Sequence, residues 1–412
     1  MRISHLRQRL YDLGAKPCHE DRLLRGWSQV CSYDRKGSPA ETFFPLALRN
    51  ELPGIEAELD GLARLKSEHP DTLTLPLSQG ERELNRHSDN EKVARLLIEL
   101  HDGQMVESVL LPRGGLCVST QVGCAVGCVF CMSGRDGLLR QLGSAEIVAQ
   151  VVLARKRRAV SKVVFMGMGE PAHNLDNVLE AIELLGTQGN IGHKNLVLST
   201  VGDLRVFERL MEGLTHKPSP QPSGGTTDHS TRPSENNGQV AGHPACGRGG
   251  NRERQSSIAA VKPALALSLH TTDEVLRTRL LPQAPRIPVE ELVERAEIYA
   301  RATGYPVQYQ WTLIEGVNDS DAELARIVQL LKGKYAIMNF IPFNEVDGLT
   351  YRRPSGERIA AMAYALNGQG IYSRVRDSAG QEIEGACGQL RARAAKTRES
   401  ASNIRGQILQ RA

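Results

Sequence analysis

The spacing of hydrophobic positions changes along the chain and predicts two regions. In the first 92 residues, apolar side chains recur at helical spacing: Leu6, Leu10 and Leu13 fall on one helical face. Apolar runs within 23–27 and 46–52 predict two more helices. Residues 1–92 are therefore expected to form a small helical accessory domain.

The second region begins with a predicted hairpin and continues as strands alternating with helices. Apolar runs at 95–100 and 105–111 flank Asp102-Gly103, a dipeptide that favours a tight hairpin turn. From about residue 114, short apolar runs alternate with helical patterns such as 144–158 and 289–302. This alternation predicts parallel strands in an α/β barrel or an open doubly wound sheet. The expected strands span 116–121, 162–166, 195–200, 263–269, 307–313 and 335–341.

Polar residues stand at or just past the ends of these expected strands. In α/β folds the chemistry collects at the carboxyl ends of the strands, so these side chains are expected to share one site. Gly169 would let the backbone approach a ligand closely, and the carboxylate of Glu170 could hold an ammonium group. The residues at strand ends are Cys124, Glu170, Ser199, His270 and Asn344.

Three cysteines, Cys124, Cys128 and Cys131, are spaced C-x3-C-x2-C. Three thiolates on so short a loop can hold three corners of a [4Fe–4S] cluster and leave one iron without a protein ligand. An open iron is what S-adenosylmethionine needs to bind through its amino and carboxylate groups, so the spacing favours reductive radical chemistry over electron transfer. A zinc site is the alternative, but it would need a fourth Cys or His at similar spacing, and no second C-x2-C pair follows.

Composition narrows the class of protein. With 412 residues and 40% hydrophobic content, the chain can bury a large core, and its net charge of +4 permits RNA binding without proving it. Eight cysteines are too sparse and clustered for a disulfide scaffold, which fits a reducing cytoplasm. The chain has no apolar signal core near Met1 and no run of about 18 apolar residues, so we expect a cytoplasmic protein without a membrane span.

Two segments lie outside the expected core. Residues 217–257 contain Val240 as their only large apolar residue, so we expect a disordered insertion. A metal site at His229, His243 and Cys246 is a remote alternative for this segment. The tail 391–412 is basic and is either a solvated end or an RNA-contacting arm.

Taken in order, the motifs resemble the RlmN/Cfr family of radical S-adenosylmethionine RNA methyltransferases. The resemblance runs from about residue 96 to residue 390 and is interrupted by the insertion. It is carried by the three-cysteine loop, Gly167-Met168-Gly169-Glu170-Pro171, Ser268-Leu269-His270, Ile341-Pro342-Phe343-Asn344 and Ala386-Cys387-Gly388-Gln389-Leu390. The N-terminal region resembles the helical RNA-binding extension of this family more loosely.

The resemblance implies a partial (β/α) barrel that spans 93–390 and binds one [4Fe–4S] cluster. It also implies that each turnover uses two S-adenosylmethionine molecules. Cys124, Cys128 and Cys131 would hold the cluster. The residues implied to contact S-adenosylmethionine are Gly169, Glu170, Ser199, Ser268, Leu269, His270 and Asn344.

The resemblance also implies a mechanism for methylating an adenine ring carbon, which polar methyl transfer cannot reach. Cys387 would first accept a methyl group from S-adenosylmethionine, giving S-methylcysteine. A 5′-deoxyadenosyl radical from a second molecule would remove hydrogen from that methyl group, and the carbon radical would add to the base. Glu107 would take the ring proton, and Cys117 would then attack the sulfur of Cys387 and leave a transient disulfide.

The implied partners are rRNA or tRNA and an electron donor such as flavodoxin or ferredoxin, with the protein acting as a monomer. The target base would have to be unstacked, and the basic run 155–158 is either a phosphate contact or a solvated helix end. Methylation at C2 is the first hypothesis, and C8 methylation of 23S rRNA, of the antibiotic-resistance type, is the second. A radical enzyme with a non-RNA substrate and a non-enzymatic RNA-binding scaffold are the remaining alternatives.

Overall fold

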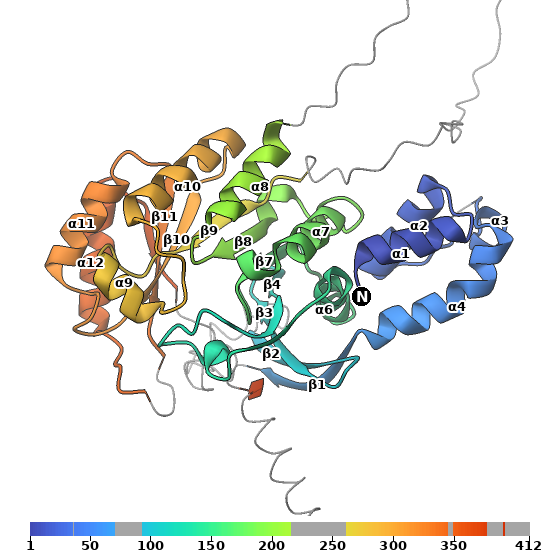
Figure 1. The fold of residues 1–412 in the computed structure, drawn as a ribbon, viewed down its shortest axis with the longest axis horizontal. Coiled ribbons are helices and arrows are strands. Elements are labelled where there is room, and N and C mark those ends of the chain that lie inside the picture. Colours follow the sequence, from blue (N-terminus) through green and yellow to red (C-terminus); the bar gives the residue numbers. More distant parts are fainter. Residues whose placement is uncertain (36, 71–92, 216–260, 345–348, 377–389, 392–412) are drawn as a thin grey trace, which may run out of the picture.

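The computed structural model describes residues 1–35, 37–70, 93–215, 261–344, 349–376 and 390–391. The insertion expected at 217–257, the proposed methyl carrier Cys387 and tail residues 392–412 lie outside the described residues. Figure 1 shows the N-terminal helices at one end of the molecule and the later helices at the other, with the sheet between them.

The N-terminal region forms the expected helices and then adds a strand. Leu6 and Leu10 are buried, and α1 packs against α7 while α2 packs against α6 of the larger part. Beyond the helices, β1 pairs antiparallel with β2 and so joins the main sheet. The domain boundary at residue 92 therefore stays a prediction. The elements are α1 (Ile3–Asp12), α2 (Pro17–Gln29), α3 (Ala40–Phe43), α4 (Leu46–Gly61) and β1 (Ala63–Pro70).

One large sheet organises the rest of the described chain, in the order β1-β2-β3-β4-β7-β8-β9-β10-β11-β12. The first four strands are antiparallel, and β4 to β12 run parallel. The sheet is open, which confirms a partial barrel and not a closed one. Its strands are β2 (Ala94–Leu100), β3 (Met105–Leu111), β4 (Gly115–Cys117), β7 (Lys162–Phe165), β8 (Leu196–Thr200), β9 (Ala264–Ser268), β10 (Val307–Leu313), β11 (Ala336–Pro342) and β12 (Ser373–Val375).

The predicted hairpin at Asp102-Gly103 is confirmed by the antiparallel pairing of β2 with β3, and Gly103 has a φ of 78°. The strand expected at 116–121 is instead divided in two. Val118 still donates to the carbonyl of Val164 at 3.0 Å, but the chain then leaves the large sheet. Its continuation, β5 (Gln121–Gly123), pairs with β6 (Leu138–Gln141), and these two strands bracket the three-cysteine loop.

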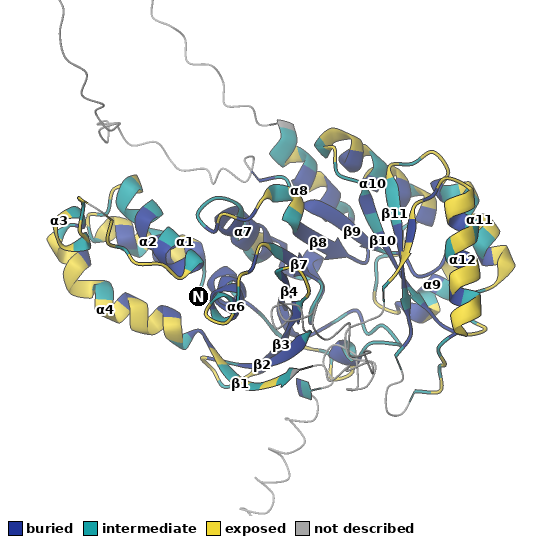
Figure 2. Ribbon diagram, turned by 180° about the vertical axis from the view of Figure 1, so that it is seen from behind, coloured by how far each residue is buried: buried dark blue, intermediate teal, exposed yellow. Residues whose placement is uncertain are grey.

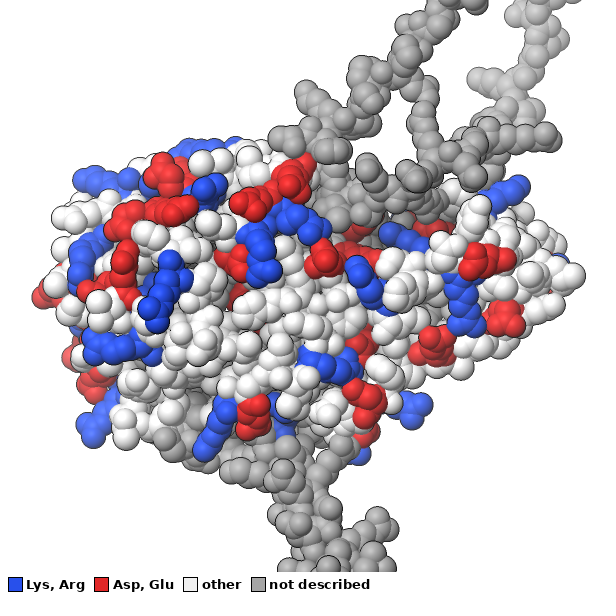
Figure 3. Space-filling view, in the orientation of Figure 1, with Lys and Arg blue, Asp and Glu red and all other residues white. Residues whose placement is uncertain are grey.

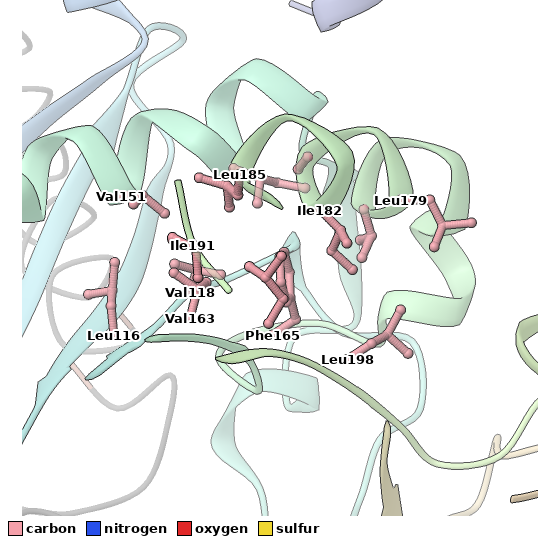
Figure 4. Close-up of a cluster of buried hydrophobic side chains, with 14 of the residues drawn as sticks. Leu116, Val118, Val151, Val163, Phe165, Leu179, Ile182, Leu185, Ile191 and Leu198 are labelled. Carbon is pink, nitrogen blue, oxygen red and sulfur yellow. The ribbon is translucent and has the colours of Figure 1, made fainter. Parts of the chain in front are cut away.

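Helices pack side by side on one face of the sheet and bury the main core (Figure 1, Figure 2). Figure 4 shows Leu116, Val163 and Phe165 from the strands meeting Leu179 and Ile182 of α7. Because side chains alternate along a strand, the residues between them face the other way. The helices are α6 (Ser144–Arg155), α7 (Leu175–Gly186), α8 (Leu204–Thr215), α9 (Glu274–Leu280), α10 (Val289–Thr303), α11 (Asp321–Leu331) and α12 (Gly356–Gly368).

The opposite, concave face of the sheet carries a second cluster of small side chains. Cys117 and Val164 alternate with the outward-facing Leu116 and Val163, and Ala266 continues the same face on β9. The side chains of this cluster are smaller than the Leu and Phe side chains that pack on the helix side.

Candidate active site

A cavity of about 270 Å³ lies at the carboxyl ends of the parallel strands. Residues that follow β7, β8, β9 and β11 meet there with the three-cysteine loop, as the strand-end argument predicted. The predicted site residues that line this cavity are Cys124, Cys128, Cys131, Gly169, Glu170, Ser199, Ser268, His270 and Asn344. Leu269 differs from its neighbours, because its side chain is fully buried in the main core and only its backbone could face a ligand.

The three-cysteine loop is fixed by backbone hydrogen bonds to two other segments. Cys124 donates to the carbonyl of Gly137 at 3.0 Å, and Val129 donates to the carbonyl of Leu280 in α9 at 3.1 Å. Burial raises the pKa of the Cys124 thiol to about 12 and also raises that of Cys128 and Cys131. Burial therefore favours the protonated thiols, and a cationic metal centre bound by the three cysteines would replace their protons.

The donor set fits three corners of an iron–sulfur cube. All three cysteines line one cavity, and each is a free thiol. A cluster of this kind takes one thiolate at each of three separate corners.

Glu170 follows β7, and its position depends on the backbone conformation of the preceding residue, Gly169. Gly169 has a φ of 101°, and a Cβ added there would lie 2.6 Å from the side chain of Gln121. The Glu170 carboxylate accepts N–H bonds from Ala172 at 3.1 Å and from Val201 at 3.0 Å. Burial still dominates and raises the pKa of Glu170 to about 7, so a positively charged partner would restore its ionised form.

His270 is neutral and its tautomer follows from its hydrogen bonds. Its Nδ1 accepts the N–H of Thr312 at 2.9 Å, so the ring proton is on Nε2. Burial lowers the pKa of His270 to about 3. The ring packs on Phe130 of the cysteine loop at a centroid distance of 4.8 Å, and the His270 carbonyl accepts from Asn318 at 2.7 Å. A left-handed φ of 62° is thereby held in place.

Glu107 and Cys117 lie together in the sheet, outside the cavity lining. The neighbouring strands β3 and β4 carry them in antiparallel register, with Val109 opposite Cys117. Burial raises the pKa of the Cys117 thiol to about 12, and the charges of Glu107 and Arg95 act on it in opposite directions. Glu107 also raises the pKa of Cys131, which places its charge close to the cysteine loop as well as to Cys117.

The C-terminal segment reaches Glu107 at Arg391. The backbone N–H of Arg391 donates to Oε1 of Glu107 at 2.9 Å, and its guanidinium lies 3.6 Å from Asp136, just past the cysteine loop. Nη1 of Arg95 lies 4.0 Å from Oε2 of Glu107. Glu107 is buried, with 2% of its surface exposed.

The basic run 155–158 contacts the protein itself. Arg155 donates to the carbonyl of Ser28 at 2.6 Å, and Lys156 and Arg157 pair with acidic groups of the N-terminal region. Arg158 donates to the carbonyl of Leu111 at 2.6 Å. These contacts hold the end of α6 against the N-terminal region and β3. On the face drawn in Figure 3, Lys and Arg side chains are interspersed with Asp and Glu.

Three residues of the site carried no sequence signal. Arg277 is buried on α9 beside the cavity, Gln121 supports Gly169 and Glu170, and Asn318 holds the loop at His270. Each is an ordinary polar residue in its local pattern, so only the tertiary fold reveals its position.

An open parallel sheet with three free cysteines at its carboxyl edge defines a radical S-adenosylmethionine enzyme. The profile described as "Radical SAM superfamily" matches residues 118–217, and enzymes of this class use a [4Fe–4S] cluster and S-adenosylmethionine. The crystal structure of a radical SAM methyltransferase from Sphaerobacter thermophilus superposes with a TM-score of 0.67 and 29% identity, covering 94% of this chain and 97% of that one.

Two curated relatives extend the match to almost the whole chain. A probable RNA methyltransferase of Aromatoleum aromaticum is 58% identical over 393 residues, which cover 95% of this chain and 93% of the relative. One from Pseudomonas aeruginosa strain UCBPP-PA14 is 56% identical over 396 residues, covering 96% of both chains. This chain belongs to the RlmN/Cfr-type family of radical S-adenosylmethionine RNA methyltransferases. None of the described helices is long and apolar enough to cross a membrane.

Proposed function

We propose that the protein methylates an adenine ring carbon, C2, in rRNA or tRNA through an S-methylcysteine at Cys387. RNA as the substrate class is supported by relatives named probable RNA methyltransferases. The observation that carries the chemistry is the position of Glu107 and Cys117 on adjacent strands, with Glu107 two residues from Val109, the residue opposite Cys117, and with the charge of Glu107 acting on both Cys117 and Cys131. An enzyme that only abstracts hydrogen needs neither group.

In this proposal Cys124, Cys128 and Cys131 hold the cluster, and the strand-end residues hold S-adenosylmethionine. Together, the two cofactors supply a 5′-deoxyadenosyl radical when bound. Glu170 accepts from the amino group of S-adenosylmethionine, and the Nε2–H of His270 faces the same cavity as a neutral donor. Ser199, Ser268 and Asn344 provide further polar contacts, and Gly169 and Leu269 provide backbone contacts.

Cys387 receives the methyl group. In the sequence it stands four positions before Arg391. Arg391 is itself hydrogen-bonded to Glu107. The short sequence separation between Cys387 and a residue bound to Glu107 supports Cys387 as the methyl carrier.

Glu107 takes the proton that leaves the ring carbon, and Cys117 releases the product. Burial raises the pKa of the Cys117 thiol, so it stays protonated until resolution. Resolution requires its proton to leave, after which the thiolate attacks the sulfur of Cys387. The bond from that sulfur to the methylene carbon then breaks, and the carbon takes up a proton to become the methyl group of the released base. The disulfide is then reduced by an external thiol. Flavodoxin or ferredoxin serves as electron donor, and the protein acts as a monomer.

The test is an anaerobic reaction of reconstituted protein, S-adenosylmethionine, a reductant and unmodified RNA, with mass spectrometry of the digested nucleosides. We expect 2-methyladenosine, its loss in Cys387→Ala, and a covalent RNA adduct that accumulates in Cys117→Ala. Cys18→Ser, far from these residues in sequence, serves as the control. A product that elutes with 8-methyladenosine would assign the C8 reaction instead. Release of 5′-deoxyadenosine with no methyladenosine would refute RNA adenine as the substrate.

A further inference from the structure

Arg277 lies on α9, the helix whose end is fastened to the cysteine loop. Val129 of that loop donates to the carbonyl of Leu280, the last residue of α9, at 3.1 Å. Just beyond the helix, Gln283 donates to the carbonyl of Val126 at 3.2 Å. Two backbone contacts thus fix the helix and the loop relative to each other, and a side chain on α9 keeps a defined position beside the loop.

The guanidinium of Arg277 is buried, with 5% of the residue exposed. One nitrogen, Nη2, donates to the carbonyl of Val201, and the N–H of Val201 donates to the Glu170 carboxylate at 3.0 Å. Its Nε is also buried and makes no hydrogen bond to the part of the chain that the structure describes. Burying a cation in this way is costly unless negative charge stands nearby.

Arg277 contacts the site through Val201, which lines the cavity together with Cys128 and packs with the cysteine loop. Burial lowers the pKa of Arg277 to about 10, and the opposing interactions come from Cys128 first and Glu170 second. Cys128 is one of the three cysteines assigned to the cluster, and as an iron ligand it would be a thiolate and so supply a counter-charge to the guanidinium.

We propose that Arg277 is a charge-compensating residue for the iron–sulfur cluster, which raises the reduction potential of the cluster from its place beside Cys128. The inference rests on the assignment of the cluster to Cys124, Cys128 and Cys131. Reduction adds one electron, from a low-potential donor, to a centre that already bears the charge of three thiolates. A fixed positive charge stabilises the reduced form more than the oxidised form, and exclusion of water strengthens the effect.

The test compares Arg277→Met, which removes the charge and keeps an unbranched apolar stem, with Arg277→Lys, which keeps the charge. Arg279→Met is the matched control, because Arg279 is exposed on the same helix. Iron and sulfide are counted first in each anaerobically reconstituted protein. The reduction potential is then measured by titration with dithionite, followed by electron paramagnetic resonance, with and without S-adenosylmethionine.

We expect Arg277→Met to shift the potential to lower values without S-adenosylmethionine, while Arg277→Lys and Arg279→Met stay near the wild type. An unchanged potential in Arg277→Met would overturn the proposal. So would a shift seen only with S-adenosylmethionine, because the guanidinium would then act on that ligand and not on the cluster. If Arg277→Met fails to retain iron, Arg277→Gln, which keeps a donor for Val201, replaces it. A wild-type protein without a cluster would instead refute the cluster assignment.

Discussion

Replacing Glu170 by Gln tests whether a buried carboxylate holds the amino group of S-adenosylmethionine. The exchange keeps size and shape but removes the charge. Hydrogen bonds to charged groups contribute about 1.5–3 kcal/mol, so at pH 8 the variant should bind S-adenosylmethionine about 10- to 150-fold more weakly. The pKa of about 7 adds a pH dependence. Only about a tenth of the carboxyl groups are ionised at pH 6, so the difference in affinity should shrink about tenfold between pH 8 and pH 6.

The assay is equilibrium binding of S-adenosylmethionine to the reconstituted proteins at pH 6, 7 and 8, expressed as the ratio of the two dissociation constants. The amino group of the ligand titrates equally in both experiments, so the ratio isolates the carboxylate. Glu183→Gln, another buried glutamate in α7, is the matched control and should leave affinity unchanged. A ratio below twofold at pH 8, or a ratio that does not change with pH, would refute the reasoning.

Folding stability separates this effect from a structural defect. The pKa of Glu170 is raised from its ordinary 4.5 to about 7, which corresponds to about 3 kcal/mol. A raised carboxyl pKa stabilises the fold at low pH, and this contribution is lost as pH rises from about 4.5 through about 7. At pH 8 the ionised side chain therefore opposes folding. Glu170→Gln should unfold no earlier in denaturant than the wild type, even though it binds the ligand more weakly.

Three further perturbations follow from the geometry. Cys117 should react with iodoacetamide at pH 8 at least about 100-fold more slowly than the exposed Cys31. A thiol with a pKa of about 12 is about one part in ten thousand thiolate at that pH. Peptide mass maps measure the labelling, and equal labelling of the two cysteines would contradict this prediction. Gly169→Ala should lower the free energy of unfolding by about 1–3 kcal/mol, because the φ of 101° at this position suits only glycine. The control is Gly54→Ala, at an open position in α4, which should not destabilise the protein. Denaturant midpoints compare the two, and equal midpoints would argue against strain at Gly169. Cys128→Ser should lose the bound cluster after anaerobic reconstitution, seen as iron and sulfide per chain, and full retention would exclude this thiolate as a ligand.

The fold was largely predictable because its signals are local. The strand at Val307–Leu313 and the start of the helix at Val289 are where the apolar runs place them. The division of the first parallel strand was not predictable, because residues 116–121 contain no glycine or proline that would mark a break. The chain leaves the sheet where Thr120 donates to the carbonyl of Met168 at 2.9 Å, a contact between distant segments.

The site was predictable where a motif fixes it and not where tertiary contacts do. The three cysteines of the loop can be identified as cluster ligands from their spacing alone. The hydrogen bond between Arg391 and Glu107 joins positions 284 residues apart, so no local pattern indicates it. Arg277 and Arg279 alternate along one short helix and look equivalent in sequence. Only the docking of α9 decides that the first is buried and the second exposed.

Burial favours the uncharged forms of the cysteines, of His270 and of Glu170, and Arg277 is a buried cation beside them. The cysteine thiols are protonated, His270 is neutral, and Glu170 ionises only near pH 7. Cluster assembly must then release three thiol protons, which makes it more favourable as pH rises. The same step creates the thiolate charge that the guanidinium lacks. The polypeptide is thus arranged for the charge of the assembled centre, at a cost in the metal-free state that the cluster itself removes.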